Sequence, residues 1–586
     1  MRKQSIQSKL RGRGLKLNRE QMAAVAQLNG VSVVNAGAGT GKSTVIVAKI
    51  IAAHIDDPCS SVLAISFTKK AVSELQARII GAQNVLVSTF HSFFYRILRN
   101  NGYKSFRFLE NDAQKKGILR IVIDQLGLSE KVTVQDLFDA ITLGNFSDDN
   151  IKLAFSAYLD LLKSKRLMCF DSLQYFVLEL LQTRPAVAMR TKNLFDYVLI
   201  DEAQDLSKVQ SEIMKLIWPA DTLNNMTIVG DYKQAIYGFR GSKSNVMAEL
   251  TQYYNAEIFH LNINYRSTAS ILNAANAVLP SDEVLIPNKK TKGKEPVFSV
   301  ADNPAKEAKS VVESIVKLRN EGIKLNDIAV LFRSSVAVAD VYEELIAANI
   351  PFVKLGSDAL RWNNSRMKQF LSLLAFSFNP DNPHFKCALP ALGIPMSVVN
   401  DMDYSYRAAF SDRLLNIPSL SQTQREALNE FFAIDAKSTS LRDLSCILWD
   451  RHLKKFFSAE DDDILEEWLD AIAKFETFEE LRAHVAKIRV QAKKMARLVN
   501  NPTADYLRLM SIHASKGLEY DYVYLIGAAD GVLPSLGHDK ATDIDEENRL
   551  AYVAVTRAKE RLFVSYPAAC GQNINEPSRF FKQFYK

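Results

Sequence analysis

Residues 36–44 read AGAGTGKST, a glycine-rich turn between an apolar run at residues 31–34 and a helical pattern at residues 45–53. The glycines let the backbone bend so that its N–H groups face a phosphate. The helix that follows points its positive N-terminal end at the same place. The Lys42 ammonium can reach terminal phosphates, and the Ser43 hydroxyl can bind magnesium. The stretch therefore predicts a strand, a turn and a helix that together bind a nucleoside triphosphate, although Ala36 stands where a glycine is common.

A second stretch, YVLIDEAQD at residues 197–205, supplies the acidic groups that phosphate chemistry needs. Its first four residues predict a short buried strand, which ends at Asp201 and Glu202. We expect Asp201 to bind magnesium through water and Glu202 to polarise the attacking water. A glycine-rich structural turn is the alternative interpretation of residues 36–44, and the presence of both stretches makes it the weaker one.

The composition is that of an ordinary globular protein with several domains. The chain has 586 residues, of which 47% are hydrophobic and 24% are charged, so large cores are possible and wholesale disorder is not expected. The formal net charge of +7 permits nucleic-acid binding without requiring it. Residues 1–19 carry seven basic side chains and no acidic one. They form either an arm that binds phosphates or a solvated tail.

The five cysteines are scattered along the chain, with no C-x-x-C pair. This pattern argues against a zinc or iron–sulfur module and against a disulfide framework, and it fits a reducing compartment. No apolar run is long enough to cross a membrane, and the N terminus has no apolar signal core. We therefore expect a cytoplasmic protein with no membrane partner.

Short apolar runs that end in polar or glycine-containing residues recur in two sets. The first set lies at residues 31–34, 62–67, 85–90, 197–200, 227–230 and 258–263, and the second at 328–332, 507–512, 522–526 and 561–564. Such strands, separated by helical patterns, are typical of parallel sheets covered on both faces. A long helical stretch interrupts each set and indicates an inserted domain. The predicted fold class is α/β, with two parallel-sheet domains that each carry a mainly helical insertion.

Polar and aromatic side chains follow several of the predicted strands. Strand ends in an open α/β sheet face the ligand crevice, and aromatic rings there can stack on bases of any sequence. The candidates for contact with DNA are Phe67, Thr68, Lys69, Thr89, Phe90, His91, Tyr237, Phe239, Arg240 and His513. Core packing of Tyr237 and Phe239 and a structural role for His91 are the alternatives.

A second group of polar residues suits a nucleotide. The Gln21 carboxamide can both donate to and accept from the edge of adenine, and Tyr265 can stack on the base. Gln234 can sense the terminal phosphate. Arg266 and Arg557 can complete a phosphoryl-transfer site, so that closure of two domains is linked to hydrolysis. A surface position is the alternative for Gln21 and for each arginine taken singly.

These motifs, in this order, resemble those of the superfamily 1A DNA helicases, the UvrD/PcrA/Rep family. The markers are LNREQ (17–21), AGAGTGKST (36–44), TFHS (89–92), IDEAQD (200–205), GDYKQAIYGFRG (230–241), NYRS (264–267), SIHASKGLEY (511–520) and AYVAVTRAKE (551–560). The resemblance implies two RecA-like domains with ATP between them. The first would comprise residues 1–95 and 191–265 and the second 266–355 and 503–586, with helical insertions at 96–190 and 356–502.

The resemblance also implies roles for the matching residues. The implied nucleotide-binding set is Gln21, Ala38, Gly39, Thr40, Gly41, Lys42, Ser43, Thr44, Tyr265, Arg266, Glu519 and Arg557. The implied catalytic set is Lys42, Asp201, Glu202, Gln234, Arg266 and Arg557, with Ser43 and Asp201 at Mg²⁺. Family members often carry Trp where this chain has Phe239, and a phenylalanine ring can still stack.

The expected function is therefore ATP-dependent, with movement 3′ to 5′ along single-stranded DNA and separation of the duplex ahead. The expected partners are single-stranded DNA, junctions of single and double strands, and a nuclease or a repair or replication protein, in an intracellular, nucleoid-associated setting. Two alternatives stay open. One is a translocase or motor subunit of a nuclease or defence complex with weak unwinding of its own. The other is an ATP-gated DNA-binding protein without net movement.

Overall fold

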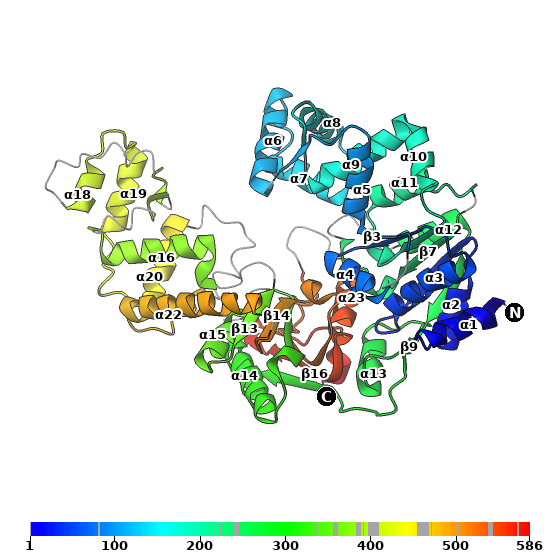
Figure 1. The fold of residues 1–586 in the computed structure, drawn as a ribbon. Helices are drawn as coiled ribbons and strands as arrows, with labels where there is room; N and C mark the ends of the chain where they lie inside the picture. Colours follow the sequence, from blue (N-terminus) through cyan, green and yellow to red (C-terminus); the bar gives the residue numbers. More distant parts are fainter. Residues whose placement is uncertain are drawn as a thin grey trace. The chain divides into compact units, whose positions relative to one another are not determined.

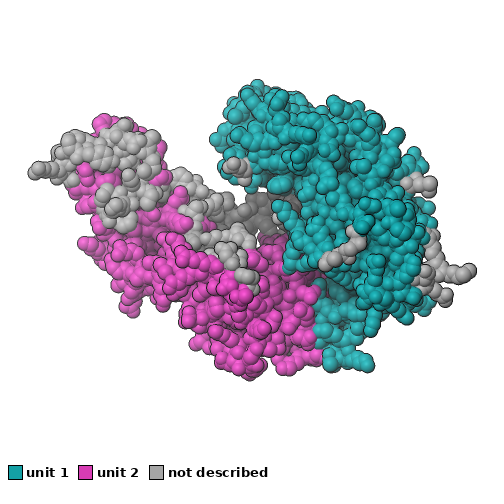
Figure 2. Space-filling model, in the orientation of Figure 1, with its two compact units in different colours: residues 1–292 teal, residues 293–586 magenta. Residues whose placement is uncertain are grey.

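A computed structural model describes most of the chain: residues 2–79, 83–109, 111–222, 224–238, 245–334, 337–355, 361–381, 388–390, 392–395, 409–453, 468–469, 471–501, 503–536, 543–570 and 573–585. The chain forms two compact units, residues 1–292 and 293–586 (Figure 2). Each unit contains a six-stranded sheet in which every pairing is parallel. The predicted α/β class with two parallel sheets is confirmed. The proposed four-part division into domains stays a prediction, and residues 266–292 lie in the first unit.

The sheet of unit 1 has the strand order β3-β2-β6-β7-β1-β8. Its strands are β1 (Val31–Ala36), β2 (Val62–Ser66), β3 (Val85–Thr89), β6 (Tyr197–Ile200), β7 (Met226–Gly230) and β8 (Glu257–Leu261). Successive strand side chains point to opposite faces, so Val34 packs in one core cluster and Val33 in another. Both faces are therefore buried, which explains why the strands are nearly continuous apolar runs.

Helices cover the two faces of this sheet (Figure 1). One core cluster contains side chains from α1 (Arg2–Gly12), α2 (Arg19–Ala26), α3 (Lys42–Asp56) and α4 (Lys69–Arg78). The other contains side chains from α5 (Phe90–Asn100), α9 (Phe170–Thr183), α11 (Lys208–Ile217) and α12 (Val246–Tyr254). Short segments complete the unit: β9 (Ile263–Asn264), α13 (Ala269–Val278) and β10 (Ile286–Pro287).

A mainly helical segment separates β3 from β6 in the chain of unit 1. It runs through β4 (Arg107–Phe108), α6 (Asp112–Gln125), α7 (Val134–Leu143), α8 (Asp149–Ser164), β5 (Leu167–Met168), α9 and α10 (Pro185–Lys192). Figure 1 shows α6, α7 and α8 grouped together, and α6 and α8 each contact α7. The predicted helical insertion is present.

The sheet of unit 2 has the strand order β11-β16-β15-β12-β14-β13. Its strands are β11 (Val297–Ala301), β12 (Ile328–Phe332), β13 (Phe352–Leu355), β14 (Leu507–Ser511), β15 (Tyr520–Ile526) and β16 (Ala558–Pro567). The helices α14 (Pro304–Asn320), α15 (Ala339–Ala347) and α23 (Ile544–Val555) accompany the sheet. The sequence analysis did not predict β11 and β13, the two edge strands.

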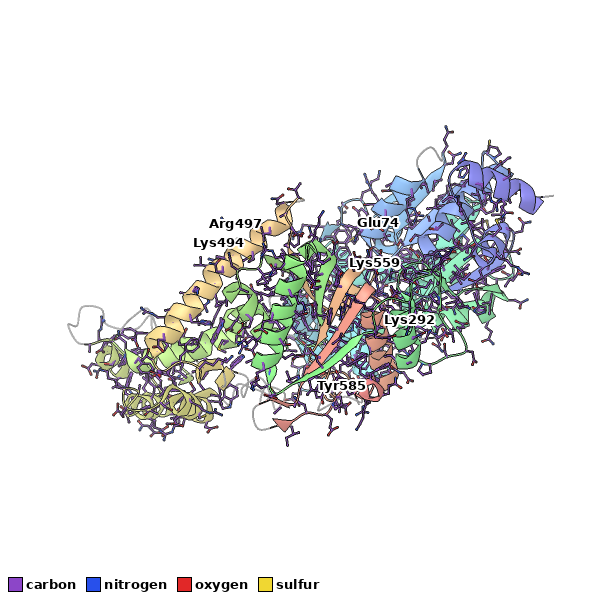
Figure 3. All side chains as sticks on the ribbon, turned by 90° about the horizontal axis from the view of Figure 1, so that it is seen from below. Glu74, Lys292, Lys494, Arg497, Lys559 and Tyr585 are labelled. Carbon is purple, nitrogen blue, oxygen red and sulfur yellow. The ribbon has the colours of Figure 1, made fainter. Side chains whose placement is uncertain are left out.

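The second insertion is also mainly helical where the structure describes it. Its helices are α16 (Ser365–Phe378), α18 (Phe410–Leu415), α19 (Gln422–Phe432), α20 (Leu441–Leu448) and α22 (Phe478–Ala496). Figure 3 shows α22 as a long helix with Lys494 labelled near its end. Among the described residues of the whole chain, no helix has the length and apolar character needed to span a bilayer.

Candidate active site

Residues 36–44 run from the last residue of β1 through a turn to the first three residues of α3. The turn has the conformation that the sequence predicts. Gly39 and Gly41 have φ values of 68° and 89°, in the left-handed region that favours glycine. Gly41 is the N-cap of α3, and no side chain caps that helix. The first backbone N–H groups of a helix need acceptors, and here they have no side-chain oxygen. The turn therefore presents a positive helix end suited to an anion.

The loop after β9 lies directly against this turn. The Asn264 side chain donates to the Ala38 carbonyl at 2.6 Å and accepts from the Arg266 backbone N–H at 2.8 Å. The Tyr265 backbone N–H donates to the Gly39 carbonyl at 2.9 Å. A Cβ on Gly39 would lie 2.7 Å from the Cβ of Arg266. Tyr265 and Arg266 are thus fixed beside the turn, and Asn264, which the sequence analysis did not single out, fixes them.

The start of α2 adds a third wall. The Gln21 carboxamide is buried, donates to the Thr40 carbonyl at 2.9 Å and accepts from the Asn18 backbone N–H at 3.1 Å. The Asn18 side chain caps α2 and donates to the Tyr265 hydroxyl at 2.9 Å. Tyr265 as a whole residue is 40% exposed. Both polar groups of the Gln21 side chain therefore hold the turn and the start of α2 together.

The remaining residues of the predicted turn have different environments. Ser43 is exposed, whereas Ala38 is buried. The Thr40 hydroxyl donates to the Gly37 carbonyl at 2.8 Å, and Arg78 from α4 donates to the Thr44 hydroxyl at 2.9 Å. Thr40 and Thr44 therefore stabilise the turn through their side chains, which leaves Ser43 as the hydroxyl that faces solvent.

The acidic pair at the end of β6 lies next to the phosphate lysine. The Lys42 Nζ lies 3.7 Å from the Glu202 carboxylate. Glu202 has φ 52° and ψ 43°, an uncommon conformation for a non-glycine residue that occurs at functional sites. Asp201 is buried, and its carboxylate accepts from the Ser66 hydroxyl at 3.2 Å and from the Glu202 backbone N–H at 3.0 Å. Burial and the neighbouring Glu202 charge raise the pKa of Asp201, and Lys42 opposes that rise.

These residues fit a divalent cation. Carboxylate and hydroxyl oxygens are the ligands that Mg²⁺ prefers, and Asp201, Glu202 and Ser43 supply them. Burial is the largest cause of the raised pKa of Asp201, the Glu202 charge adds to it, and Lys42 offsets the two only in part. A cation would supply the missing positive charge.

A chain of buried amides joins Glu202 to the next strand. The Gln204 side chain donates to the Glu202 carboxylate at 2.6 Å and accepts from the Asp231 backbone N–H at 3.0 Å. The Gln234 side chain in turn donates to the Asp231 carboxylate at 2.6 Å. Gln204 and Asp231 were not among the predicted site residues, although both lie inside the quoted motifs. Their contacts connect the predicted general base to the predicted phosphate sensor.

The predicted residues of unit 2 lie just outside the ends of β14, β15 and β16. Arg557 is 1% exposed, and its guanidinium donates to the carbonyls of Val553 and Leu518 at 3.0 and 3.1 Å. Glu519 is exposed and lies 3.8 Å from the Lys559 ammonium, which Figure 3 labels. His513 begins a short 3-10 helix after β14 and is partly exposed. The structure thus holds Arg557 rigidly, by contacts with its own unit.

Two of the predicted DNA contacts form a ring pair in unit 1. The rings of Phe67 and Tyr237 stack with centroids 5.8 Å apart and an interplanar angle of 16°, and both are partly exposed. Tyr237 is therefore not a fully buried core residue. Lys69 is exposed at the start of α4. Phe239 and Arg240 lie outside the described residues.

Three other predicted DNA contacts have structural roles. Phe90 is 3% exposed and belongs to the core beside Phe94, so in this conformation it is not available for stacking on a base. The Thr68 and Thr89 hydroxyls cap α4 and α5, accepting from the backbone N–H groups of Ala71 and Ser92. A threonine after a strand suits both a helix cap and a DNA contact, so its position in the sequence does not distinguish the two roles.

The structure adds an aromatic residue that the sequence analysis missed. Phe170, at the start of α9, is 64% exposed, and its ring meets His91 edge to face at 5.4 Å and Phe108 at 5.6 Å. Burial lowers the pKa of His91, and the nearby Asp171 charge opposes that shift. Phe170 lies far from the strand-end motifs in the chain, so only the fold brings it to His91. A large exposed ring next to a predicted DNA contact is a candidate stacking platform.

Comparison with known proteins agrees with this geometry. The UvrD/REP helicase N-terminal domain matches residues 17–255, and the UvrD-like helicase C-terminal domain matches residues 259–569. The chain is 28% identical over 624 residues to the putative ATP-dependent DNA helicase YjcD of Bacillus subtilis (strain 168), which covers 96% of this chain and 80% of that protein. It is 28% identical over 641 residues to the ATP-dependent DNA helicase PcrA of Leuconostoc citreum, and this match covers 97% of the present chain and 84% of that protein. Because the C-terminal match alone spans more than half of the chain, this protein belongs to the UvrD-like helicase family.

Proposed function

We propose that the protein is an ATP-dependent DNA helicase that moves 3′ to 5′ on single-stranded DNA and opens the duplex ahead. The observation that carries the proposal is the uncapped N terminus of α3 beside Lys42, which lies 3.7 Å from Glu202. An anion-binding helix end, a cation and an acidic residue are together what phosphoryl transfer needs. Membership of the UvrD-like helicases supports DNA as the partner.

In this proposal, residues of unit 1 carry out hydrolysis. The N–H groups of the turn and the Lys42 ammonium hold the terminal phosphates of ATP. Glu202, held by Gln204, orients the attacking water and accepts its proton. Mg²⁺, when bound through Asp201 and Ser43, supplies positive charge against the phosphate oxygens. Gln21 and Tyr265 hold the adenine, and Arg266 reaches the phosphates from its place beside Gly39.

Two residues of unit 2 are proposed to contact the nucleotide. As the family resemblance implies, Glu519 would lie near the ribose and Arg557 would contact the terminal phosphate, for which its buried guanidinium must leave the carbonyls of Val553 and Leu518. Domain closure would then be linked to hydrolysis, because an arginine from a second domain completes the charge balance only when the domains meet. The four-part arrangement of two RecA-like domains and two insertions is part of the same proposal.

The buried amide chain offers a route from ATP to DNA. A change at Glu202 alters the hydrogen bonds of Gln204 and Asp231, and therefore those of Gln234. Tyr237 lies three residues after Gln234 in the chain, and its ring stacks on that of Phe67. We propose that bases of single-stranded DNA stack on this pair and on Phe170 beside His91. Lys69, His513, Phe239 and Arg240 complete the proposed track, and sequence preference should be slight because stacking does not read bases.

We further propose single-stranded DNA and strand junctions as substrates, with a nuclease or a repair or replication protein as a possible partner, in a cytoplasmic, nucleoid-associated setting. The alternative of an ATP-gated DNA-binding protein without movement is less well supported, because Glu202 and its hydrogen-bond partner are both in place for repeated hydrolysis. The alternative of a motor with weak unwinding of its own differs in output and not in site chemistry.

Unwinding polarity is the decisive test. Duplexes with either a 3′ or a 5′ single-stranded tail are mixed with the protein and ATP, and strand release is followed by fluorescence. We expect release from the 3′-tailed duplex, little release from the 5′-tailed one, and none with Glu202→Gln. Glu212→Gln, which removes an exposed acid paired with Lys215, is the matched control. Release only from the 5′-tailed duplex would contradict the polarity, and DNA-stimulated ATPase activity without release would favour the translocase alternative.

A further inference from the structure

The N-terminal segment, residues 2–19, is a docked element and not a loose tail. In α1, Ile6 and Leu10 are buried in the same core cluster as α3, and Leu15 and Leu17 pack partly buried against that cluster. The helix ends where Gly14 takes a φ of 82° and the Leu15 N–H donates to the Leu10 carbonyl at 3.0 Å, a C-cap that favours glycine. Figure 1 shows α1 beside α2 and α3. The backbone of this segment is therefore held in place by its apolar side chains.

Five cations of the same segment are exposed to solvent. The exposed residues are Lys9, Arg11, Arg13, Lys16 and Arg19. No side-chain hydrogen bond or ion pair joins any of these five to another residue in the part of the chain that the structure describes. The first acidic residue, Glu20, accepts from the backbone N–H of Asn262 at 3.0 Å. Its charge is thus turned into the fold, and the cations are not neutralised locally.

The charge of this segment stands out from that of the whole chain. Its seven basic side chains equal the formal net charge of +7, so the rest of the chain carries as many acidic as basic groups. Residues 1–16 also precede the part of the chain that matches the helicase domains. Basic residues at the end of a helix stabilise it through the helix dipole, and this accounts for Lys9 and Arg11. It does not account for Arg13, Lys16 and Arg19, which lie beyond the end of α1.

The composition of the segment indicates what it binds. Residues 1–19 contain no aromatic side chain, so they cannot stack on unpaired bases as the Phe67–Tyr237 pair can. Lysine and arginine on a fixed scaffold bind phosphates, and duplex DNA carries one negative charge per about 1.7 Å of helix axis. A group of exposed cations without aromatic rings nearby in the chain therefore suits a double strand better than a single one.

We infer that the exposed cations of residues 9–19 form an accessory site for the phosphate backbone of duplex DNA, separate from the stacking residues of the proposed track. The inference rests on the proposed function only in taking DNA as the polyanion. Such a site would hold double-stranded DNA on unit 1 without reading its sequence. It would raise the affinity for substrates that contain a duplex and leave the chemistry of ATP hydrolysis unchanged.

The test compares two variants with equal loss of charge. The first, the arm variant, carries Lys9→Gln, Arg11→Gln, Arg13→Gln and Lys16→Gln, and it keeps the buried side chains of Ile6 and Leu10. The control carries Lys309→Gln, Lys317→Gln, Arg319→Gln and Lys324→Gln, at exposed positions of unit 2. Binding to a blunt DNA duplex is measured over a range of salt concentrations, and thermal unfolding checks that both variants fold.

We expect the arm variant to bind the duplex more weakly and with a shallower salt dependence. Each lost phosphate contact lowers the slope of log K against log salt by about 0.9, so a loss of about two to four is expected, with little change in the control. A slope for the arm variant that matches that of the control overturns the inference. Binding to anionic phosphatidylserine vesicles is measured in parallel, and a loss of binding that is seen with these vesicles and not with the duplex also overturns it. ATPase activity at saturating single-stranded DNA is measured in the same samples. If the wild type shows no ATPase activity with single-stranded DNA, the proposed function is contradicted. A defect of the arm variant in duplex binding would still support the accessory site in that case.

Discussion

Three strand-to-helix turns follow β1, β2 and β3 at the carboxyl ends of the parallel strands of unit 1. The helices that begin after them are capped in two different ways. After β2 and β3, the hydroxyls of Thr68 and Thr89 cap α4 and α5. After β1, the cap position is Gly41, and no side chain caps α3. The fold is the same in all three places, so the sheet alone does not make a site. The site arises where the chain leaves helix N–H groups without a side-chain acceptor and places Lys42 and Glu202 beside them.

Removing the predicted general base should have the largest effect. Glu202→Gln keeps the size of the side chain and takes away its ability to accept a proton, so we expect kcat for ATP hydrolysis to fall by about 100-fold to 10,000-fold. Nucleotide binding, measured with a fluorescent ATP analogue, should persist, because Lys42 and the turn remain. A variant with near wild-type kcat would show that another group activates the water.

Changing the turn itself should weaken nucleotide binding. Gly39→Ala places a Cβ at a φ of 68° and 2.7 Å from both Arg266 Cβ and Asn264 Nδ2, a strain of about 1–3 kcal/mol. The turn must shift to relieve this strain, so its N–H groups no longer face the phosphates, and we expect roughly tenfold weaker binding or more. Gly30→Ala is the matched control, since Gly30 has a φ of 78° with no heavy atom within 4 Å of the added Cβ. Equal nucleotide affinities for the two variants would separate the glycine of the turn from phosphate binding.

The helix after the uncapped turn also contains a buried cation whose effect is on stability. Burial lowers the pKa of Lys49 from 10.5 to about 7, and Glu257 opposes the shift. Between the folded pKa near 7 and the unfolded pKa of 10.5, the unfolded chain binds the extra proton. Stability therefore rises with pH across this window, and it is lost as pH falls from 10.5 to the folded pKa near 7. From pH 7 to 9 the gain should be roughly 2 kcal/mol.

Chemical denaturation at several pH values measures this slope. Lys49→Met should remove it, whereas Lys70→Met, at an exposed position of α4, should not. A slope that persists in Lys49→Met would assign the pH dependence to another group.

The smallest effect is expected at the capped turns. Thr89→Ala removes the oxygen that accepts from the Ser92 N–H and should lower the unfolding free energy by about 1 kcal/mol. Because α5 begins with a cap and not with a phosphate site, nucleotide affinity should not change. Loss of nucleotide binding in this variant would break the distinction between the two kinds of turn.

The strands inside the two sheets were predictable from the sequence, and so were the edge strands of unit 1, whereas the edge strands of unit 2 were not. β6 and β12 have the predicted bounds, because strands buried on both faces are continuous apolar runs. β11 and β13 lie at the two edges of the unit 2 sheet. Their polar residues, such as Ser299 and Lys354, interrupt the apolar pattern, because an edge strand is partly exposed to solvent.

The same distinction applies to the site. Short motifs predicted Lys42, Glu202 and the glycines of the turn, because local geometry fixes the order of strand, turn and helix. They did not predict Asn264, which bridges β9 and the turn, or Phe170, which reaches His91 from a distant helix. Those contacts depend on tertiary packing and not on spacing along the chain.

The most direct test of the account is the steady-state ATPase rate with and without single-stranded DNA, for the wild type and for Lys42→Ala. Lys70→Ala, which changes an exposed lysine beside a capped turn, is the control. We expect strong stimulation of the wild type and of the control by DNA, and a loss of about 100-fold or more in Lys42→Ala. A Lys42→Ala variant that keeps the stimulated rate would contradict the assignment of the β1–α3 turn as the catalytic nucleotide site.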